Sequence, residues 1–357
     1  MSMHETGILL DEISAQIYAA IPTWAGDEPV VIAHPEITTR PWSFMLRYPL
    51  QKGGAVLLKV ARHQEMSIEQ SVSEKTLLER TEREFEMLSQ IAEVFRSHNG
   101  AASADFCFVR PLEIFPRWNA LAMEELESEP LKAYLLKPQM MLTISKDWER
   151  FEELLTQSAR WLRTYHQGMG NRESVALAET KLAVRIDHVF KNLKGHVSSA
   201  KIDALMDAVQ KKYSALAAHE VDLAMIHGDF HCGNILVTTD GRVGALDADL
   251  TQSPAYQDLA KFYADLETRG IQVLLRGNFL QTEKLKRAYR AITKGYFTET
   301  EFDEEVFQLF ILVAIIEKWL MDEIAMQQAS GITALGRRVF AGWRRAYFVK
   351  LLQEKLA

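Results

Sequence analysis

The chain has 357 residues, 48% of them hydrophobic and 25% charged, a composition typical of a globular protein long enough for two domains. Its net charge of −7 argues against general nucleic-acid binding and leaves room for a cationic substrate. Its two cysteines, Cys107 and Cys232, lack the spacing of a zinc site or a disulfide framework, so we expect a reducing, cytoplasmic setting.

We expect neither an export signal nor a membrane span in this sequence. Residues 1–11 include acidic residues where a signal peptide carries basic ones. The longest apolar run, residues 306–321, is interrupted by Gln308, Glu317 and Lys318 and is too short to cross a bilayer. We therefore predict a buried helix there.

Between Pro29 and Ala61 the sequence predicts an antiparallel meander of short strands. Three apolar runs, at residues 30–32, 43–48 and 55–61, are separated by proline-rich or Gly-Gly turns. Lys59 lies in the third run, where an unpaired ammonium is costly unless a carboxylate or phosphate meets it. An edge-strand lysine that points to solvent is the alternative.

A long helix rich in glutamate is predicted at residues 73–95. Its apolar stripe includes Phe85, Leu88 and Ile91, and Glu84 lies near the edge of that stripe. The other charged residues of this helix are expected to form a solvated face.

The next segments predict two strands and a second long helix. The strands are expected at residues 105–109 and 121–126, and the polar stretch at 127–130 fits a lobe boundary. Helical spacing of apolar residues predicts a helix over residues 148–166. His166, at its end, is expected to be a buried structural hydrogen bonder.

Residues of the kind that phosphoryl transfer requires gather in the stretch 225–237. This chemistry needs a carboxylate near the attacking hydroxyl, an amide oxygen and a second carboxylate on magnesium, and a lysine on the nucleotide. Asp229 and Asn234 keep the five-residue offset of kinase catalytic loops. An Asp-Gly pair then predicts a hairpin, which brings Asp247 near Asn234. Each residue alone is more often a turn or capping residue, but the combination favours catalysis.

Three segments of this chain, at residues 227–234, 246–247 and 253–260, are similar to the aminoglycoside phosphotransferase and choline kinase-like family. They read His-Gly-Asp-Phe-His-Cys-Gly-Asn, Leu-Asp and Ser-Pro-Ala-Tyr-Gln-Asp-Leu-Ala. The resemblance implies an α+β, two-lobed protein-kinase-like fold. Residues 1–126 are then expected to form a nucleotide-binding lobe with a small antiparallel sheet and one long helix. Residues 127–357 are expected to form a larger, mainly helical lobe for catalysis and substrate binding.

The resemblance also implies an activity and roles for the loop residues. The activity is ATP-dependent phosphorylation of a hydroxyl on a small molecule of the aminoglycoside, amino alcohol or sugar type. Asp229 is expected to orient that hydroxyl and accept its proton, and Asn234 and Asp247 to hold Mg²⁺. His231 is expected either to touch the transferred phosphoryl group or to shape the loop.

Roles in nucleotide binding are implied for the N-terminal lobe. Lys59 is expected to pair with Glu84, with neighbouring glutamates of the same helix as alternatives. Glu124 to Leu126 correspond to the hinge whose backbone meets the adenine. No Gly-x-Gly-x-x-Gly precedes Lys59, so the loop before Ser43 is expected to cover the phosphates. ATP is the expected nucleotide and GTP the alternative.

Three further residues near the loop are expected to be structural. His227 is expected to bond to backbone near Asp247. Asp258 is expected to cap the helix that begins at Leu259 and to brace the catalytic loop. Cys232 is expected to be a small loop residue, with sensitivity to alkylation as the alternative.

The sequence leaves the acceptor open. The segment 247–249 departs from the Asp-Phe-Gly of protein kinases and no Ala-Pro-Glu follows, which argues against protein substrates. A group of arginines in the last third would suit an anionic membrane surface, an acidic sugar or plain solvation, and a group of acidic residues would suit a cationic amine. The arginines are Arg337, Arg338, Arg344 and Arg345, and the acidic residues are Asp265, Glu267, Asp322 and Glu323.

Two other functions are alternatives to a small-molecule kinase. A catalytically degenerate kinase-like protein would bind nucleotide without turnover. A metal-dependent phosphoesterase would use Asp229 and His231 as metal ligands, but histidine is scarce after His231 and no Gly-Asn-His occurs. We expect a small-molecule partner, and neither a nucleic acid nor a protein partner is indicated.

Overall fold

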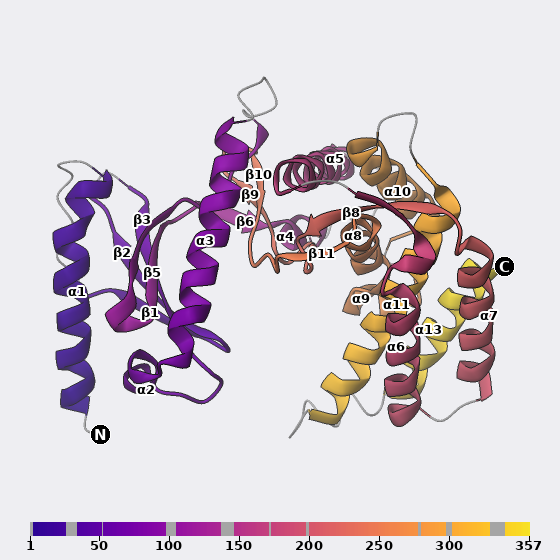
Figure 1. Cartoon of the computed structure of the whole chain (residues 1–357), viewed down its shortest axis with the longest axis horizontal. Coiled ribbons are helices and arrows are strands. Elements are labelled where there is room, and N and C mark those ends of the chain that lie inside the picture. The colour runs from indigo at the N-terminus through magenta and orange to yellow at the C-terminus, as the bar shows by residue number, and fades with distance from the viewer. Residues whose placement is uncertain are drawn as a thin grey trace. The chain divides into compact units, whose positions relative to one another are not determined.

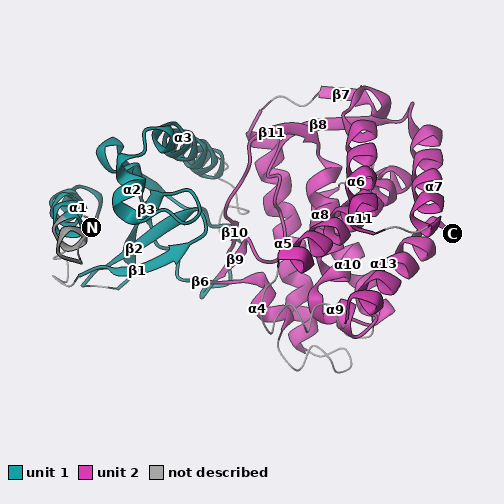
Figure 2. Ribbon diagram, turned by 90° about the horizontal axis from the view of Figure 1, so that it is seen from below, with its two compact units in different colours: residues 1–128, 238–242 teal, residues 129–237, 243–357 magenta. Residues whose placement is uncertain are grey.

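The computed structural model describes residues 3–25, 34–51, 53–97, 105–136, 146–170, 173–197, 200–277, 280–297, 302–328 and 340–357. In this part the chain divides into two compact units (Figure 2). Unit 1 comprises residues 1–128 with 238–242, and unit 2 comprises residues 129–237 with 243–357. The strand predicted at 30–32, together with Arg337 and Arg338, lies outside the described residues.

Unit 1 contains a five-stranded antiparallel sheet with the order β1-β2-β3-β5-β4. The predictions at 43–48, 55–61 and 121–126 are confirmed as β2, β3 and β5. The five strands are β1 (Glu36–Arg40), β2 (Ser43–Pro49), β3 (Ala55–Ala61), β4 (Pro111–Phe115) and β5 (Ala120–Glu124).

Two parts of this sheet differ from the sequence prediction. The strand predicted at 105–109 is wrong, because the strand of this region begins at Pro111. Phe106, Cys107 and Val109 are buried, which explains their apolar pattern, but apart from an isolated bridge at Phe106 they form no strand. No strand was expected at β1, because its sequence shows no alternation of polar and apolar side chains. In the structure all five of its residues are exposed.

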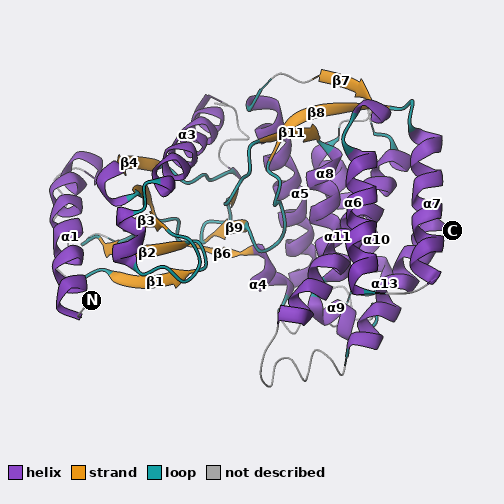
Figure 3. Ribbon diagram, turned by 60° about the horizontal axis from the view of Figure 1, so that its bottom comes forward, coloured by secondary structure: helices purple, strands orange, loops and turns teal. Residues whose placement is uncertain are grey.

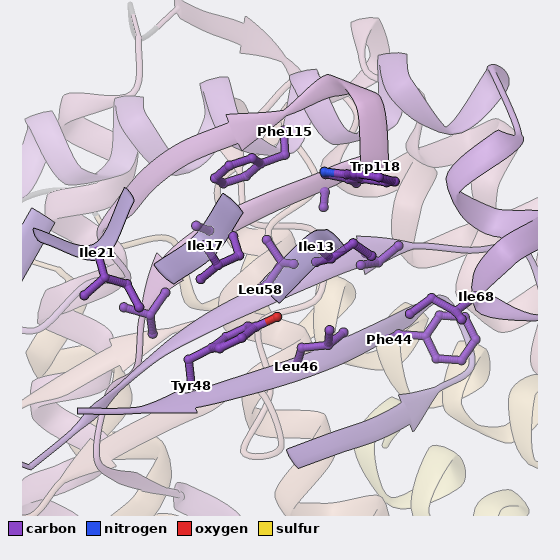
Figure 4. Close-up of a cluster of buried hydrophobic side chains, with 14 residues drawn as sticks. Ile13, Ile17, Ile21, Phe44, Leu46, Tyr48, Leu58, Ile68, Phe115 and Trp118 are labelled. Atoms are coloured by element: carbon purple, nitrogen blue, oxygen red, sulfur yellow. The ribbon is translucent and has the colours of Figure 1, made fainter. Parts of the chain in front are cut away.

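One face of the sheet is covered by α1 (Met3–Ala25), a helix that the sequence analysis did not predict. Leu46 and Leu58 of the sheet and Ile13 and Ile17 of α1 belong to one buried cluster (Figure 4). The isoleucines recur every four residues and therefore lie on one side of the helix.

The opposite face is covered by α3 (Thr76–Ser97), the long helix predicted at 73–95 (Figure 1). The short helix α2 (Ile68–Ser73) precedes it and begins with a capping box. Because side chains alternate along a strand, Lys59 points to the face that α3 covers, while Leu58 points toward α1.

Unit 2 is mainly helical, with two small three-stranded sheets in the orders β11-β8-β7 and β10-β9-β6 (Figure 3). Its described helices are α4 (Leu131–Leu135), α5 (Lys146–Gly168), α6 (Leu182–His196), α7 (Ala200–Leu216), α8 (Tyr256–Thr268), α9 (Gly270–Leu274), α10 (Thr282–Tyr296), α11 (Glu304–Gln328) and α13 (Ala341–Leu356). The strands are β6 (Ser128–Pro130), β7 (Glu173–Ala176), β8 (Glu220–Ile226), β9 (Ile235–Thr238), β10 (Val243–Ala245) and β11 (Thr251–Pro254).

The helix α11 packs against α6, α8 and α13 in unit 2. Its residues from Leu309 to Ile316 are all buried, which confirms the buried helix expected over 306–321. Among the described residues, no helix is long and apolar enough to span a membrane. The fold is thus α+β, with an antiparallel-sheet unit and a helical unit, as expected.

Candidate active site

The loop from His227 to Asn234 connects β8 to β9 and depends on a glycine. Gly228 has a φ of +78°, and a Cβ atom at this position would lie 3.1 Å from the Asp249 Cβ. The backbone N–H of Asp249 donates a hydrogen bond of 2.7 Å to the His227 carbonyl. Only a residue without a side chain allows the two segments to approach this closely.

Asp258, in the first turn of α8, binds the backbone at the start of the loop. Its carboxylate accepts hydrogen bonds from the backbone N–H groups of His227 at 2.6 Å and Gly228 at 2.8 Å, and from His166 Nε2 at 3.0 Å. Burial opposes the charge, but the contacts with His166 and the loop N–H groups outweigh it and lower the pKa of Asp258. The bracing role is confirmed. The capping role is wrong, because α8 begins earlier, after Ala255.

His166 and His227 are both buried, but they differ in their partners. The ring of His166 bonds to Asp258 and, at 2.7 Å, to the hydroxyl of Tyr296, which confirms its structural role. Neither ring nitrogen of His227 has a hydrogen-bond partner among the described residues, and burial lowers the pKa of His227. The expected bond to backbone near Asp247 is therefore made by the His227 carbonyl and not by its ring.

Asp229 is exposed and its carboxylate is oriented by two neighbours. Asn234 Nδ2 donates to Asp229 Oδ2 at 2.9 Å, and His231 Nε2 lies 3.4 Å from the same oxygen. The hydrogen bond from His231 is the largest cause that lowers the pKa of Asp229, to about 2, against the opposing effect of partial burial. The ammonium groups of Lys261 and Lys318 lower it further. The carboxylate is therefore ionised at any physiological pH.

His231 is fixed by its own loop. The backbone N–H of Gly233 donates to His231 Nδ1 at 2.9 Å, so the proton of the neutral ring lies on Nε2, the atom near Asp229. A Cβ atom at Gly233 would lie 2.7 Å from the His231 Cε1 atom. The glycine therefore provides the space that the imidazole occupies.

We expect Gly233→Ala to displace His231 and to lower turnover about 10-fold or more, because the added methyl group takes the position of the imidazole. The free energy of unfolding should fall by only about 1 kcal/mol, since the loop is partly exposed and can adjust. Steady-state kinetics and chemical denaturation measure the two effects. Gly342→Ala, at a position with open space around the would-be Cβ, is the matched control. Unchanged kinetics in Gly233→Ala would contradict the assignment.

Asn234 and Asp247 are brought together by the β9–β10 hairpin. Ala245 pairs with Ile235, and the N–H of Leu246 donates to the Asn234 carbonyl at 3.0 Å. Asp247 follows at once, exposed and with a φ of +59°. Because Asn234 directs its amide N–H₂ at Asp229, its Oδ1 atom is left as an acceptor on the other side.

This pair of oxygen donors fits Mg²⁺, which binds through one or two protein oxygens and completes its shell with water and phosphate. Within the described ranges, no three His, Cys, Asp or Glu side chains are arranged to hold a metal ion. The two-metal site of a phosphoesterase, which needs more such ligands, is therefore absent from this part of the chain.

In unit 1, Lys59 and Glu84 form the expected ion pair. Lys59 Nζ lies 2.5 Å from Glu84 Oε1, and both side chains are largely buried, with exposed fractions of 16% and 19%. Glu84 and not Glu82 or Glu86 makes this contact, since it lies on the side of α3 that faces β3. A role of the pair toward a nucleotide remains a prediction.

The other residues expected to meet the nucleotide are also in unit 1. Ser43 is buried and begins β2, directly after a two-residue turn from β1. The N–H of Glu124 donates to the Arg110 carbonyl at 3.0 Å, and the carbonyl of Leu126 accepts from Ser128 Oγ at 3.0 Å. The N–H of Glu124 is therefore not available to a nucleotide base, whereas the Leu126 carbonyl can accept a second hydrogen bond.

The contact that Asp265 makes beneath the loop was not predicted from the sequence. Asp265 lies two turns after Asp258 on α8 and accepts a hydrogen bond of 3.2 Å from the N–H of Cys232. The seven-residue spacing of the two aspartates was the available signal. Cys232 itself is fully buried, and burial raises the pKa of its thiol, which argues against alkylation.

The chain resembles a known protein family and several solved structures. Residues 76–293, more than half of the chain, match the model of the Phosphotransferase enzyme family, and no curated protein sequence matches. A solved structure of a glucosamine kinase in complex with glucosamine, ADP and inorganic phosphate is similar, with 14% identity and a TM-score of 0.52 over 95% of this chain and 98% of that one. The Plasmodium vivax ethanolamine kinase has 13% identity and a TM-score of 0.52 over 96% and 90%. These likenesses show a protein-kinase-like fold.

Proposed function

Since the chain belongs to the Phosphotransferase enzyme family, we propose that it is a small-molecule kinase that transfers the terminal phosphoryl group of ATP to a hydroxyl group. The observation that carries the proposal is the Asp229 carboxylate, ionised and oriented by Asn234 and His231 on a loop that Asp258 braces. The structurally similar glucosamine and ethanolamine kinases support a small-molecule acceptor.

In this proposal Asp229 accepts a hydrogen bond from the acceptor hydroxyl and takes its proton. With a pKa of about 2 it is a weak base, so its contribution comes from orienting the hydroxyl for in-line attack more than from basicity. His231 holds the carboxylate in place, since it bonds to Asp229 and to the Gly233 backbone. The proton is transferred late, as the phosphoryl group is bonded to the acceptor oxygen.

Asn234 and Asp247 are the residues that would hold Mg²⁺ in this account. Bound magnesium supplies charge neutralisation on the phosphate oxygens. The hairpin fixes the spacing of the two side chains through the bond between Leu246 and Asn234. Asn234 also contacts Asp229, so the same side chain links the metal position to the position of the hydroxyl.

Lys59 is proposed to bind the nucleotide phosphates, with Glu84 holding its ammonium in place. The ADP in the similar glucosamine kinase structure supports an adenine nucleotide, with GTP as the alternative. Lys59 precedes the segment that matches the family model, so a variant of Lys59 tests a part of the proposal that this match does not cover.

A test of the proposed function measures ADP release from ATP and Mg²⁺ with a panel of amino alcohols, aminoglycosides, sugars and hydroxy acids. We expect acceptor-dependent release, and we expect Lys59→Met to lower kcat/KM for ATP about 100-fold, because one preorganised charge on the phosphates is lost. Lys75→Met removes an exposed lysine of the same unit and is the matched control. Nucleotide binding without release on any acceptor would favour the catalytically degenerate alternative instead.

A further inference from the structure

The acidic residues that the sequence offered as sites for a cationic amine are already neutralised inside unit 2. Asp265 pairs with Arg269, and Lys318 Nζ lies 3.6 Å from its other oxygen. A carboxylate that is paired and buried cannot also receive the amine of a ligand without losing its partner. The remaining pairs are Glu267 with Lys355, Asp322 with Arg344, and Glu323 with Arg345.

The same ion pairs leave the described arginines unavailable to a ligand. Arg344 and Arg345 of α13 point at α11 and bond to Asp322 and Glu323 there. They hold two helices together and are not a free basic face. Arg344 and Arg345 are therefore not available to an anionic membrane surface, and the other two arginines of that group lie outside the described residues.

Two lysines, by contrast, lie beside the catalytic loop and are less fully paired. Lys261 of α8 donates to the Gly228 carbonyl and has no carboxylate partner among the described residues. Lys318 of α11 shares Asp265 with Arg269, and 35% of its side chain is exposed. Asp265 in turn accepts a hydrogen bond of 3.2 Å from the N–H of Cys232, so its contact with Lys318 places this lysine beside the loop.

The two lysines differ in what they can still bind. Lys261 is committed to the loop backbone. Among the described residues Lys318 has a single ion pair, at 3.6 Å and therefore longer than a good charged hydrogen bond, so its ammonium can take a second, closer anion. Its neighbours on α11 fix the helix, because Glu317 pairs with Arg185, and Trp319 stacks on Phe348.

We propose that Lys318 binds an anionic group of the acceptor, so that the hydroxyl substrate is a carboxylated or phosphorylated compound and not a cationic amine. This rests on the phosphotransferase activity proposed above. The anion would lie beside Lys318, and the hydroxyl would lie beside Asp229. Two exposed carboxylates of the described residues, Asp247 and Asp249, follow the hairpin, and Asp247 is assigned to magnesium. Asp249, which lies against Gly228, is the one of the two that remains for a cationic acceptor.

Two sets of small alcohols that differ in charge test this proposal. One set is D-glucuronate, D-glucose and D-glucosamine, and the other is D-glycerate, glycerol and serinol. Titration calorimetry in the presence of ADP and Mg²⁺ measures binding without requiring turnover. We expect the anionic member of each set to bind about 10-fold or more tightly than the cationic member, as a charge-assisted hydrogen bond predicts.

Variants of one side chain identify the group responsible. Lys318→Met keeps the length of the side chain and is expected to abolish the preference for the anion, while Lys318→Arg retains it. Lys350→Met, which removes an exposed lysine of α13, is the matched control. A preference for the cationic members, or an anion preference that survives in Lys318→Met, would overturn the proposal. So would a rise in the KM for ATP alone, which would assign Lys318 to the nucleotide.

ADP release in the same variants separates this proposal from the function on which it rests. Binding of the anions without any ADP release from ATP would count against the kinase and leave the Lys318 assignment intact. ADP release with the cationic members alone would count against the Lys318 assignment and leave the kinase intact.

Discussion

Asp229→Asn is expected to lower acceptor-dependent ADP release about 1,000-fold, because the amide can neither accept the hydroxyl proton nor orient the hydroxyl as the carboxylate does. The substitution keeps the size of the side chain and an oxygen for the contact with Asn234. Nucleotide binding should therefore persist. The measurement is steady-state kinetics together with the Kd for ADP in the presence of Mg²⁺.

The control for this variant is Asp207→Asn, which changes an exposed aspartate of α7 by the same chemistry. It should leave both turnover and nucleotide binding unchanged. Turnover near the wild-type rate in Asp229→Asn would show that the reaction does not use this carboxylate. Equal losses of turnover and of nucleotide affinity would show that the substitution had disrupted the loop. The free energy of unfolding of the variant distinguishes this outcome from a loss of catalysis alone.

Asp258→Ala is expected to destabilise the fold by about 3–5 kcal/mol, the cost of removing one partner from a buried charged pair. The loss leaves the N–H groups of His227 and Gly228 and the ring of His166 without their common acceptor. Chemical denaturation monitored by tryptophan fluorescence measures the effect. Asp207→Ala is the control, and a loss below about 1 kcal/mol would contradict the bracing role.

The same carboxylate gives a pH dependence whose sign follows from its pKa. The pKa of Asp258 is lower in the folded chain than in the unfolded chain, so its ionised form stabilises the fold. That contribution is complete above the ordinary pKa of an aspartate, and it is lost as the pH falls through the folded value. As the pH is lowered, the free energy of unfolding of Asp258→Ala should therefore fall less steeply than that of the wild-type protein.

The catalytic loop could be predicted because its proposed functional residues lie close together in the sequence. Asp229 and Asn234 lie at a fixed offset, and the Asp-Gly turn determines where Asp247 returns. Lys59 was identifiable for a different reason, as a charge inside an apolar strand that needs a partner. The sequence restricted its partner to the glutamates of one helix, and in the structure that partner is Glu84.

The surroundings of the loop could not be predicted from local patterns. Lys318 reaches Asp265 from a helix more than fifty residues further along the chain, and such a contact depends on how α8 and α11 pack. The pairing of Arg344 with Asp322 depends in the same way on α13. Charges that looked available for a ligand in the sequence are therefore internal ion pairs in the fold.

The fate of the terminal phosphate of ATP tests the central claim most directly. ATP labelled in its γ-phosphate is incubated with Mg²⁺ and the acceptor that binds most tightly, and the products are separated. A hydroxyl kinase places the label in a phosphate ester of the acceptor, in proportion to the ADP formed, and Asp229→Asn abolishes this transfer. Label found only in inorganic phosphate, at a rate that does not depend on the acceptor, would contradict the account.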